Sequence, residues 1–159
     1  RGQQRAGGGD EGLRAARAIA LLSYRGYDAY ATTQTEAPDD PRLRDYRAST
    51  YQRYQGDKLV ARFDAYSYVA LSRTMDTHHL GRHRGGVQAA LATIRARTLV
   101  LGISSDVLFP VREQRELAQG IAGAVYNELD SGFGHDGFLL ETVRITQQLE
   151  RFYAPVLTH

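Results

Sequence analysis

The sequence predicts a helical region followed by one part of an α/β domain with parallel strands. Apolar residues recur at spacings of three and four through about the first 90 residues, which is typical of helices. A short apolar run at residues 98–103 and a second predicted strand at residues 124–129 then alternate with helical patterns. The order strand, helix, strand, helix is that of a parallel sheet whose strands are joined by helices.

The chain is predicted to begin with a flexible segment and a helix. Residues 1–11 are rich in glycine and polar side chains, which disfavour regular structure. Residues 12–25 place an apolar stripe on one helical face, made of Leu13, Ala16, Ala20, Leu21 and Tyr24. Arg17 lies within this stripe, two turns before Tyr24. A guanidinium on an apolar face needs a partner, so Arg17 either binds a ligand or reaches solvent or an internal carboxylate.

Further helical segments extend this part of the chain to about residue 90. Residues 26–50 are polar and contain Pro38 and Pro41, so they are predicted to form a long connection. Residues 51–77 resume a helical pattern, and a basic loop and a short helix follow over residues 78–94. We therefore expect a helical domain over residues 12–90.

Residues 91–159 are expected to belong to the α/β part. Branched apolar residues in the first run predict a strand buried on both faces. Pro110 suits the first turn of a helix ending near Gly120, and a last helix is predicted from Gly137 to Phe152. That helix would face inward with Phe138, Leu139, Val143, Leu149 and Phe152. Two strands do not make a stable sheet alone, so further strands are expected from sequence outside this chain, most simply before it.

Composition narrows the classes of function. A net charge of +2 gives no global field for nucleic acid or acidic membranes, and no apolar run approaches the length of a membrane span. The absence of cysteine excludes disulfides and thiolate chemistry and fits a cytoplasmic protein. His78, His79 and His83 are close in sequence, but no carboxylate is placed to join them, so no metal site is expected.

Two titratable residues follow the two predicted strands. Asp106 comes after the first strand and His135, 29 residues later, after the second. Ligands of parallel sheets bind at the carboxyl ends of the strands. A carboxylate that orients an imidazole general base is the acid and base pair of a Ser-His-Asp triad. The alternative is a helix-capping Asp and a surface His, but Gly132, Gly134 and Gly137 shape the turn around His135 and favour the pair.

Four motifs in order resemble the homoserine O-acetyltransferase family of α/β-hydrolase-fold acyltransferases. Gly102-Ile-Ser-Ser-Asp-Val-Leu-Phe-Pro and Gly134-His-Asp-Gly-Phe-Leu are similar to the family's acid and histidine motifs. The stretch Gly12-Leu-Arg-Ala-Ala-Arg-Ala-Ile-Ala-Leu-Leu-Ser-Tyr-Arg resembles the helix that opens its lid domain. Arg62-Phe-Asp-Ala-Tyr-Ser-Tyr and Leu71-Ser-Arg-Thr-Met-Asp resemble a later lid helix, with Tyr66 where the family more often has Asn. The resemblance covers residues 12–153.

This resemblance implies a role for each site residue. Asp106 would be the triad acid and His135 the general base. Asp136 would bind the amino group of the amino-acid acceptor, Arg17 its carboxylate, and Tyr24 would line the same site. The substrates would be acetyl-CoA and L-homoserine, with no cofactor, in a step of methionine biosynthesis. The lid helices, which are rich in aromatic residues, would form a homodimer.

The nucleophile that this resemblance requires is not found in the chain. None of the seven serines has glycine at both the −2 and +2 positions, as the strand-to-helix elbow G-x-S-x-G demands. We therefore expect this segment alone to be inactive and the other half of the enzyme to lie in missing N-terminal sequence or a companion chain. Alternatives are a serine O-succinyltransferase or homoserine O-succinyltransferase of the same fold, an esterase, or a non-catalytic helical interaction module.

Overall fold

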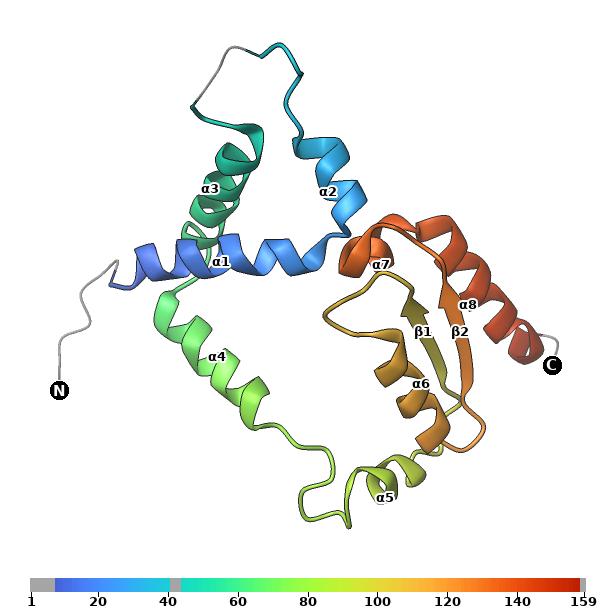
Figure 1. Cartoon of the computed structure of the whole chain (residues 1–159). Coiled ribbons are helices and arrows are strands. Elements are labelled where there is room, and N and C mark those ends of the chain that lie inside the picture. Colours follow the sequence, from blue (N-terminus) through green and yellow to red (C-terminus); the bar gives the residue numbers. More distant parts are fainter. Residues whose placement is uncertain (1–7, 41–43, 158–159) are drawn as a thin grey trace, which may run out of the picture. The chain divides into compact units, whose positions relative to one another are not determined.

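The computed structural model describes residues 8–40 and 44–157, which form two compact units. The first unit contains the chain up to Leu22 and from Ala31 to His79, and the second contains Ser23–Tyr30 and the chain from Leu80 onward (Figure 1). Residues 1–7 of the predicted flexible segment lie outside the described residues, while Asp10 and Glu11 belong to a helix. None of the described helices combines the length and the apolar character that a membrane span requires.

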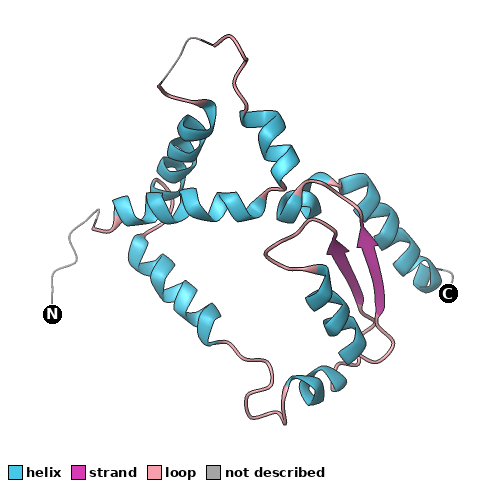
Figure 2. Ribbon diagram, in the orientation of Figure 1, coloured by secondary structure: helices cyan, strands magenta, loops and turns pink. Residues whose placement is uncertain are grey.

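The first unit is helical, as the sequence predicts. Its elements are α1 (Asp10–Tyr24), which ends in the second unit, part of α2 (Tyr27–Gln34), α3 (Arg47–Val60) and α4 (Ala65–Thr77) (Figure 2). Described residues 12–90 contain no strand. The apolar stripe predicted for α1 is confirmed in part: Leu13 and Leu21 are buried, Ala20 and Tyr24 are half-buried, and Ala16 is exposed.

Helices α1 and α3 pack closely at a glycine. A Cβ atom on Gly56 would lie 3.2 Å from the Cα of Arg14, so the small residue allows the two backbones to approach. Beside this contact, Arg14 Nε donates to Asp57 Oδ1 at 2.6 Å, and Leu59 of α3 is buried. Asp64 caps the start of helix α4, and its carboxylate accepts hydrogen bonds from the backbone N–H groups of Tyr66 and Ser67.

Two predictions for this region need correction. The connection predicted over residues 26–50 contains α2 and the first turn of α3; residues 41–43 lie outside the described residues. Helix α2 was not predicted because its sequence has no apolar face at helical spacing, and accordingly none of its residues is buried. The helical stretch 51–77 is divided at residues 61–64, since Asp64 caps a new helix.

The second unit contains the predicted parallel strands. Strands β1 (Leu99–Ile103) and β2 (Val125–Leu129) pair in parallel from Leu99 opposite Val125 to Ile103 opposite Leu129. Helix α6 (Val111–Gly120) joins them and begins after Pro110. Helix α5 (Val87–Ala92) packs on α6, where a Cβ atom on Gly120 would meet the side chain of Leu91.

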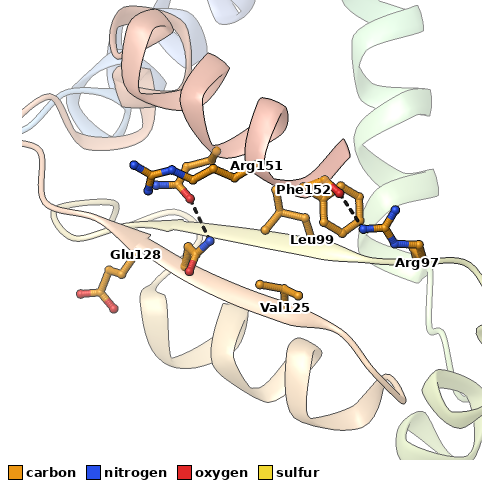
Figure 3. Close-up of a pocket in the computed structure, with 8 residues that line it drawn as sticks. Arg97, Leu99, Val125, Glu128, Arg151 and Phe152 are labelled. Atoms are coloured by element: carbon orange, nitrogen blue, oxygen red, sulfur yellow. Dashed lines mark hydrogen bonds between the residues drawn. The ribbon is translucent and has the colours of Figure 1, made fainter. Parts of the chain in front are cut away.

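Helices cover both faces of the strand pair. Helix α8 (Thr142–Leu157) lies on the face opposite α6 (Figure 3). Asn127 of β2 donates to Gln148 of α8 at 2.9 Å, and the Arg97 guanidinium donates to the Phe152 carbonyl and lies 4.6 Å from the centre of its ring. These contacts attach α8 to the strands through polar groups and one cation–π contact.

The last predicted helix is divided, and its predicted inward face is largely exposed. A turn of 3₁₀ helix (Gly134–Asp136) and α7 (Gly137–Leu140) precede α8, and the break falls at Glu141. The prediction that Phe138, Leu139, Val143 and Leu149 face inward is wrong for this chain, because between 41% and 69% of each residue is exposed. A two-stranded sheet offers too little apolar surface to cover these side chains.

Candidate active site

Asp106 occupies a tight turn directly after β1. Its backbone N–H donates to the Ile103 carbonyl at 3.1 Å, and its Oδ1 accepts hydrogen bonds from the N–H groups of Leu108 at 2.8 Å and Phe109 at 3.0 Å. The side chain is only 6% exposed. Because one carboxylate oxygen is held by the backbone, the other points in a fixed direction.

The second carboxylate oxygen of Asp106 contacts the imidazole of His135. Its Nδ1 lies 2.9 Å from Asp106 Oδ2, so the prediction that the two side chains are within hydrogen-bond reach is confirmed. Since the carboxylate only accepts, this contact places a proton on Nδ1, and Nε2 of the neutral ring is left as a proton acceptor. The His135 side chain remains 22% exposed, which keeps the imidazole accessible.

Three aromatic rings surround the imidazole. The ring centres of Phe109, Phe138 and Tyr24 lie 5.0, 5.1 and 6.0 Å from that of His135. Together with the Asp106 contact, they restrict the orientation of the ring. An open cavity of about 390 Å³ adjoins it, lined by Leu101, Ile103, Asp106, Phe109, Gln114, Leu117, His135 and Phe138.

Two serines connect the Asp106 turn to the His135 loop. The Ser105 hydroxyl donates to the Ser131 carbonyl and accepts from the Gly134 N–H at 2.9 Å. The Ser104 hydroxyl donates to Asp130 Oδ1 at 3.0 Å and accepts from the Ser131 N–H at 3.0 Å. Sequence reasoning had considered these serines only as nucleophiles, and their position beside Asp106 was the available signal for this structural role.

The segment after α1 crosses the His135 loop at two glycines. Gly134 has a φ of +65°, and a Cβ atom on it would lie 2.4 Å from the Gly26 nitrogen. A Cβ atom on Gly26 would in turn lie 2.0 Å from the Gly132 carbonyl oxygen. The prediction that glycine shapes this turn is confirmed at Gly134, where both the left-handed backbone and the close approach require it.

Asp136 and Tyr24 lie beside His135 in the same unit. Arg25 Nε donates to Asp136 Oδ2 at 3.3 Å, a contact that sequence reasoning missed because 111 residues separate the partners. Arg17 belongs to the first unit, where it lines a cavity of about 270 Å³ with Gln55, Lys58, Leu59 and Arg62. The structure thus brings together four of the five predicted site residues, and it places Arg17 among basic residues of the helical unit.

The arrangement of Asp106 and His135 suits the transfer of a proton. Within residues 8–40 and 44–157, no three His, Asp or Glu side chains gather as a ligand set. The imidazole, oriented by the buried acid, can accept a proton from a hydroxyl at Nε2 and return it later.

Solved structures share this architecture. The crystal structure of homoserine O-acetyltransferase from Bacillus anthracis superposes with a TM-score of 0.78 at 16% identity, covering 90% of this chain and 41% of that one. Esterase E22 superposes with a TM-score of 0.74 at 19% identity, covering 90% of this chain and 42% of that one. The chain therefore has the architecture of part of an α/β-hydrolase-fold protein.

Sequence comparison is more specific. Homoserine O-acetyltransferase from Cyclobacterium marinum is 41% identical over 145 residues, 91% of this chain and 41% of the relative. The Thermus thermophilus protein of that name is 43% identical over 143 residues, 89% of this chain and 36% of the relative. No family model matches the chain. The chain is thus a relative of the homoserine O-acetyltransferases and spans about two fifths of their length.

Proposed function

We propose that the full protein transfers an acetyl group from acetyl-CoA to the side-chain hydroxyl of L-homoserine, a step of methionine biosynthesis. The observation that carries the proposal is the 2.9 Å contact between His135 Nδ1 and Asp106 Oδ2, at the carboxyl ends of neighbouring parallel strands. The choice of reaction rests on the relatives, which are homoserine O-acetyltransferases, because an Asp–His pair can serve acyl transfer and hydrolysis alike.

In the proposed mechanism, His135 acts as base in two successive steps. Its Nε2 accepts the proton of a serine hydroxyl while the serine oxygen attacks the thioester carbonyl, and the proton then passes to the departing thiolate of CoA. In the second step, Nε2 accepts the homoserine hydroxyl proton as that oxygen attacks the acyl-enzyme. The proton then returns to the serine oxygen as the ester product leaves. Asp106 stabilises the imidazolium formed in each step.

The nucleophilic serine is assigned to sequence beyond these 159 residues. None of the seven serines stands in a G-x-S-x-G elbow, and Ser104, Ser105 and Ser131 are hydrogen-bonded in the loops that they connect. The relatives support this assignment, because the chain spans only 41% of the length of the Cyclobacterium marinum protein. This segment alone is therefore proposed to be inactive.

The acceptor site is proposed to use Tyr24, Asp136 and Arg17. Support comes from Tyr24, whose ring lies 6.0 Å from the imidazole, and from Asp136, which adjoins His135 in sequence. A carboxylate suits the acceptor's ammonium group, and a guanidinium suits its carboxylate. Arg17 lines a cavity with Lys58 and Arg62, and such a basic surrounding favours an anion.

Hydrolysis is the second candidate function, favoured by the fold shared with esterase E22. Water would then take the place of the amino acid, and Asp136 and Arg17 would have no substrate to bind. A succinyl donor or a serine acceptor would use the same acid and base.

Assembly and location are also part of the proposal. A homodimer through the helical unit is supported by exposed aromatic and apolar side chains on α3 and α4, including Tyr54, Tyr66, Leu71 and Met75. The cytoplasm is the proposed location, because a chain without cysteine requires no oxidising compartment.

The test uses the full-length protein. It is assayed with acetyl-CoA and succinyl-CoA as donors, with L-homoserine and L-serine as acceptors, and separately for hydrolysis of p-nitrophenyl acetate. We expect O-acetylhomoserine as the principal product and slower hydrolysis. Rapid ester hydrolysis that homoserine does not divert would support the esterase instead.

A further inference from the structure

Arg25 forms an ion pair with Asp136 beside the candidate active site. Arg25 Nε donates to Asp136 Oδ2 at 3.3 Å, and the two side chains are 26% and 24% exposed. The exposure of this pair is therefore intermediate. A fully exposed ion pair stabilises a protein little, whereas breaking a buried one is costly.

The Asp136 carboxylate has no evident structural task of its own. Asp136 precedes the first residue of α7, where an aspartate commonly accepts a hydrogen bond from the helix backbone, but its side chain makes no such bond. In the described part of the chain, the only group that donates to this carboxylate is Arg25, and it contacts Oδ2. The second oxygen, Oδ1, thus retains its capacity to accept hydrogen bonds.

The backbones that carry the pair are held together independently of it. Gly26 and Gly134 approach so closely that neither position can accept a Cβ atom, and the Tyr24 ring lies against His135. Arg25 stands between Tyr24 and Gly26, so the start of its side chain is fixed relative to the His135 loop. The guanidinium consequently has a defined position from which to orient the carboxylate.

We propose that Arg25 is a positioning residue for the amino-acid acceptor. It holds Oδ2 of Asp136 and so presents Oδ1 to the ammonium group of the acceptor, which donates a charge-assisted hydrogen bond. This inference rests on the proposed function and adds a specificity to it: acceptors with a free α-amino group are selected over hydroxy acids without one.

The experiment compares Arg25→Gln, Arg25→Lys and wild type in the full-length enzyme. Two rates are measured for each: acyl-enzyme formation, from the burst of p-nitrophenol released by p-nitrophenyl acetate, and kcat/KM for homoserine. We expect Arg25→Gln to lose roughly 10-fold in kcat/KM for homoserine, between the effects of exposed and buried pairs, with acylation changed less than about 2-fold. Arg25→Lys should recover part of the loss, since its ammonium is a single point charge. The matched control is Arg112→Gln, which removes an exposed guanidinium of α6 that pairs with Glu116 on the same helix.

A second measurement separates positioning from a merely structural role. In an Asp136→Asn background, Arg25→Gln should cause little further loss in kcat/KM for homoserine, because both changes act through one carboxylate. Additive losses, or equal damage to acylation and acceptor use, would overturn the role of Arg25 while leaving the proposed function intact. A wild-type enzyme that forms the acyl-enzyme but never acetylates homoserine would overturn the proposed function and this inference with it.

Discussion

The backbone of Gly26 crosses that of Gly134 at a distance that excludes a side chain on either residue. A Cβ atom on Gly134 would lie 2.4 Å from the Gly26 nitrogen and 2.7 Å from the Arg25 carbonyl carbon. Residues that are 108 positions apart thus meet through their main chains, directly before His135. The position of the general base therefore depends on a segment that follows α1.

Gly134→Ala should destabilise the full-length protein and reduce its activity. The residue has a φ of +65°, which costs a non-glycine residue about 1–2 kcal/mol, and the new methyl group would also meet the Gly26 backbone. Urea unfolding should show a loss of at least that size. Gly132→Ala is the matched control, because a Cβ atom there meets nothing within 4 Å. Equal stability of the two variants would contradict both the left-handed backbone at Gly134 and its close approach to Gly26.

Asp106→Asn should preserve the fold and remove most of the activity. Its amide oxygen can still accept from the Leu108 and Phe109 N–H groups, but it cannot stabilise an imidazolium. We expect kcat to fall by roughly three to four orders of magnitude, with an unfolding midpoint close to that of wild type. Asp130→Asn, in the neighbouring loop, retains an acceptor for Ser104 and should be nearly as active as wild type. A mild effect at Asp106 would remove it from the triad.

Ser105→Ala tests whether this serine connects loops or acts as the nucleophile. The change leaves the Gly134 N–H without its hydroxyl partner, at a cost of about 1–3 kcal/mol in unfolding free energy, while the Ser131 carbonyl keeps its hydrogen bond from the Ser104 hydroxyl. Acyl-enzyme should still form and be detectable by mass spectrometry of the intact protein. Its complete loss from a folded variant would identify Ser105 as the nucleophile. Ser72→Ala, on the exposed face of α4, provides the baseline.

Arg17→Ala should impair use of the acceptor more than acylation by the donor. If Arg17 binds the acceptor carboxylate, kcat/KM for homoserine should fall by an amount equivalent to roughly 2–5 kcal/mol, while the acylation burst stays nearly unchanged. Arg17→Lys should recover only part of this loss, because an ammonium lacks the planar fork of the guanidinium. Arg73→Ala, on the exposed helix α4, is the control. An unchanged acceptor constant would mean that Arg17 is structural.

Because Asp64 caps α4, the free energy of unfolding should decrease at acid pH. Hydrogen bonds from the Ser67 backbone and hydroxyl lower the pKa of the Asp64 carboxyl below its ordinary value. A depressed folded-state pKa contributes stability above the unfolded-state pKa, and this contribution is lost as pH falls through the folded-state value. Asp64→Asn keeps an acceptor without a titration, so its stability relative to wild type should rise as the solution becomes acidic. Parallel stability curves for the two proteins would contradict this linkage.

Local pattern was sufficient to predict the elements that carry the acid and the base. The strand at Leu99–Ile103 is a branched apolar run, the segment Val125–Leu129 follows the next helix, and the parallel pairing of the two follows from the helix between them. Asp106 and His135 were predictable because the carboxyl ends of adjacent parallel strands meet at one edge. Both inferences use spacing within about 40 residues of sequence.

Contacts between distant segments could not be predicted in the same way. The pairing of Arg25 with Asp136 and the crossing of Gly26 over Gly134 depend on where the chain returns after more than 100 residues. Helix α2 was missed for a different reason: its sequence has no apolar face that would predict a helix, and none of its residues is buried. The exposure of Phe138 and Val143 was missed because periodicity identifies an apolar face but not what covers it.

The discontinuous second unit has a practical consequence for dividing this chain. Residues 23–30 group with residues 80–159, although the whole of α3 and α4 intervenes. A fragment cut before residue 80 would retain both strands, Asp106 and His135, yet it would lose Tyr24, Arg25 and Gly26. Backbone at Gly134 that packs against Gly26 would then face water. A minimal fragment for crystallisation or NMR therefore needs residues 23–30 supplied as a linked peptide or by circular permutation.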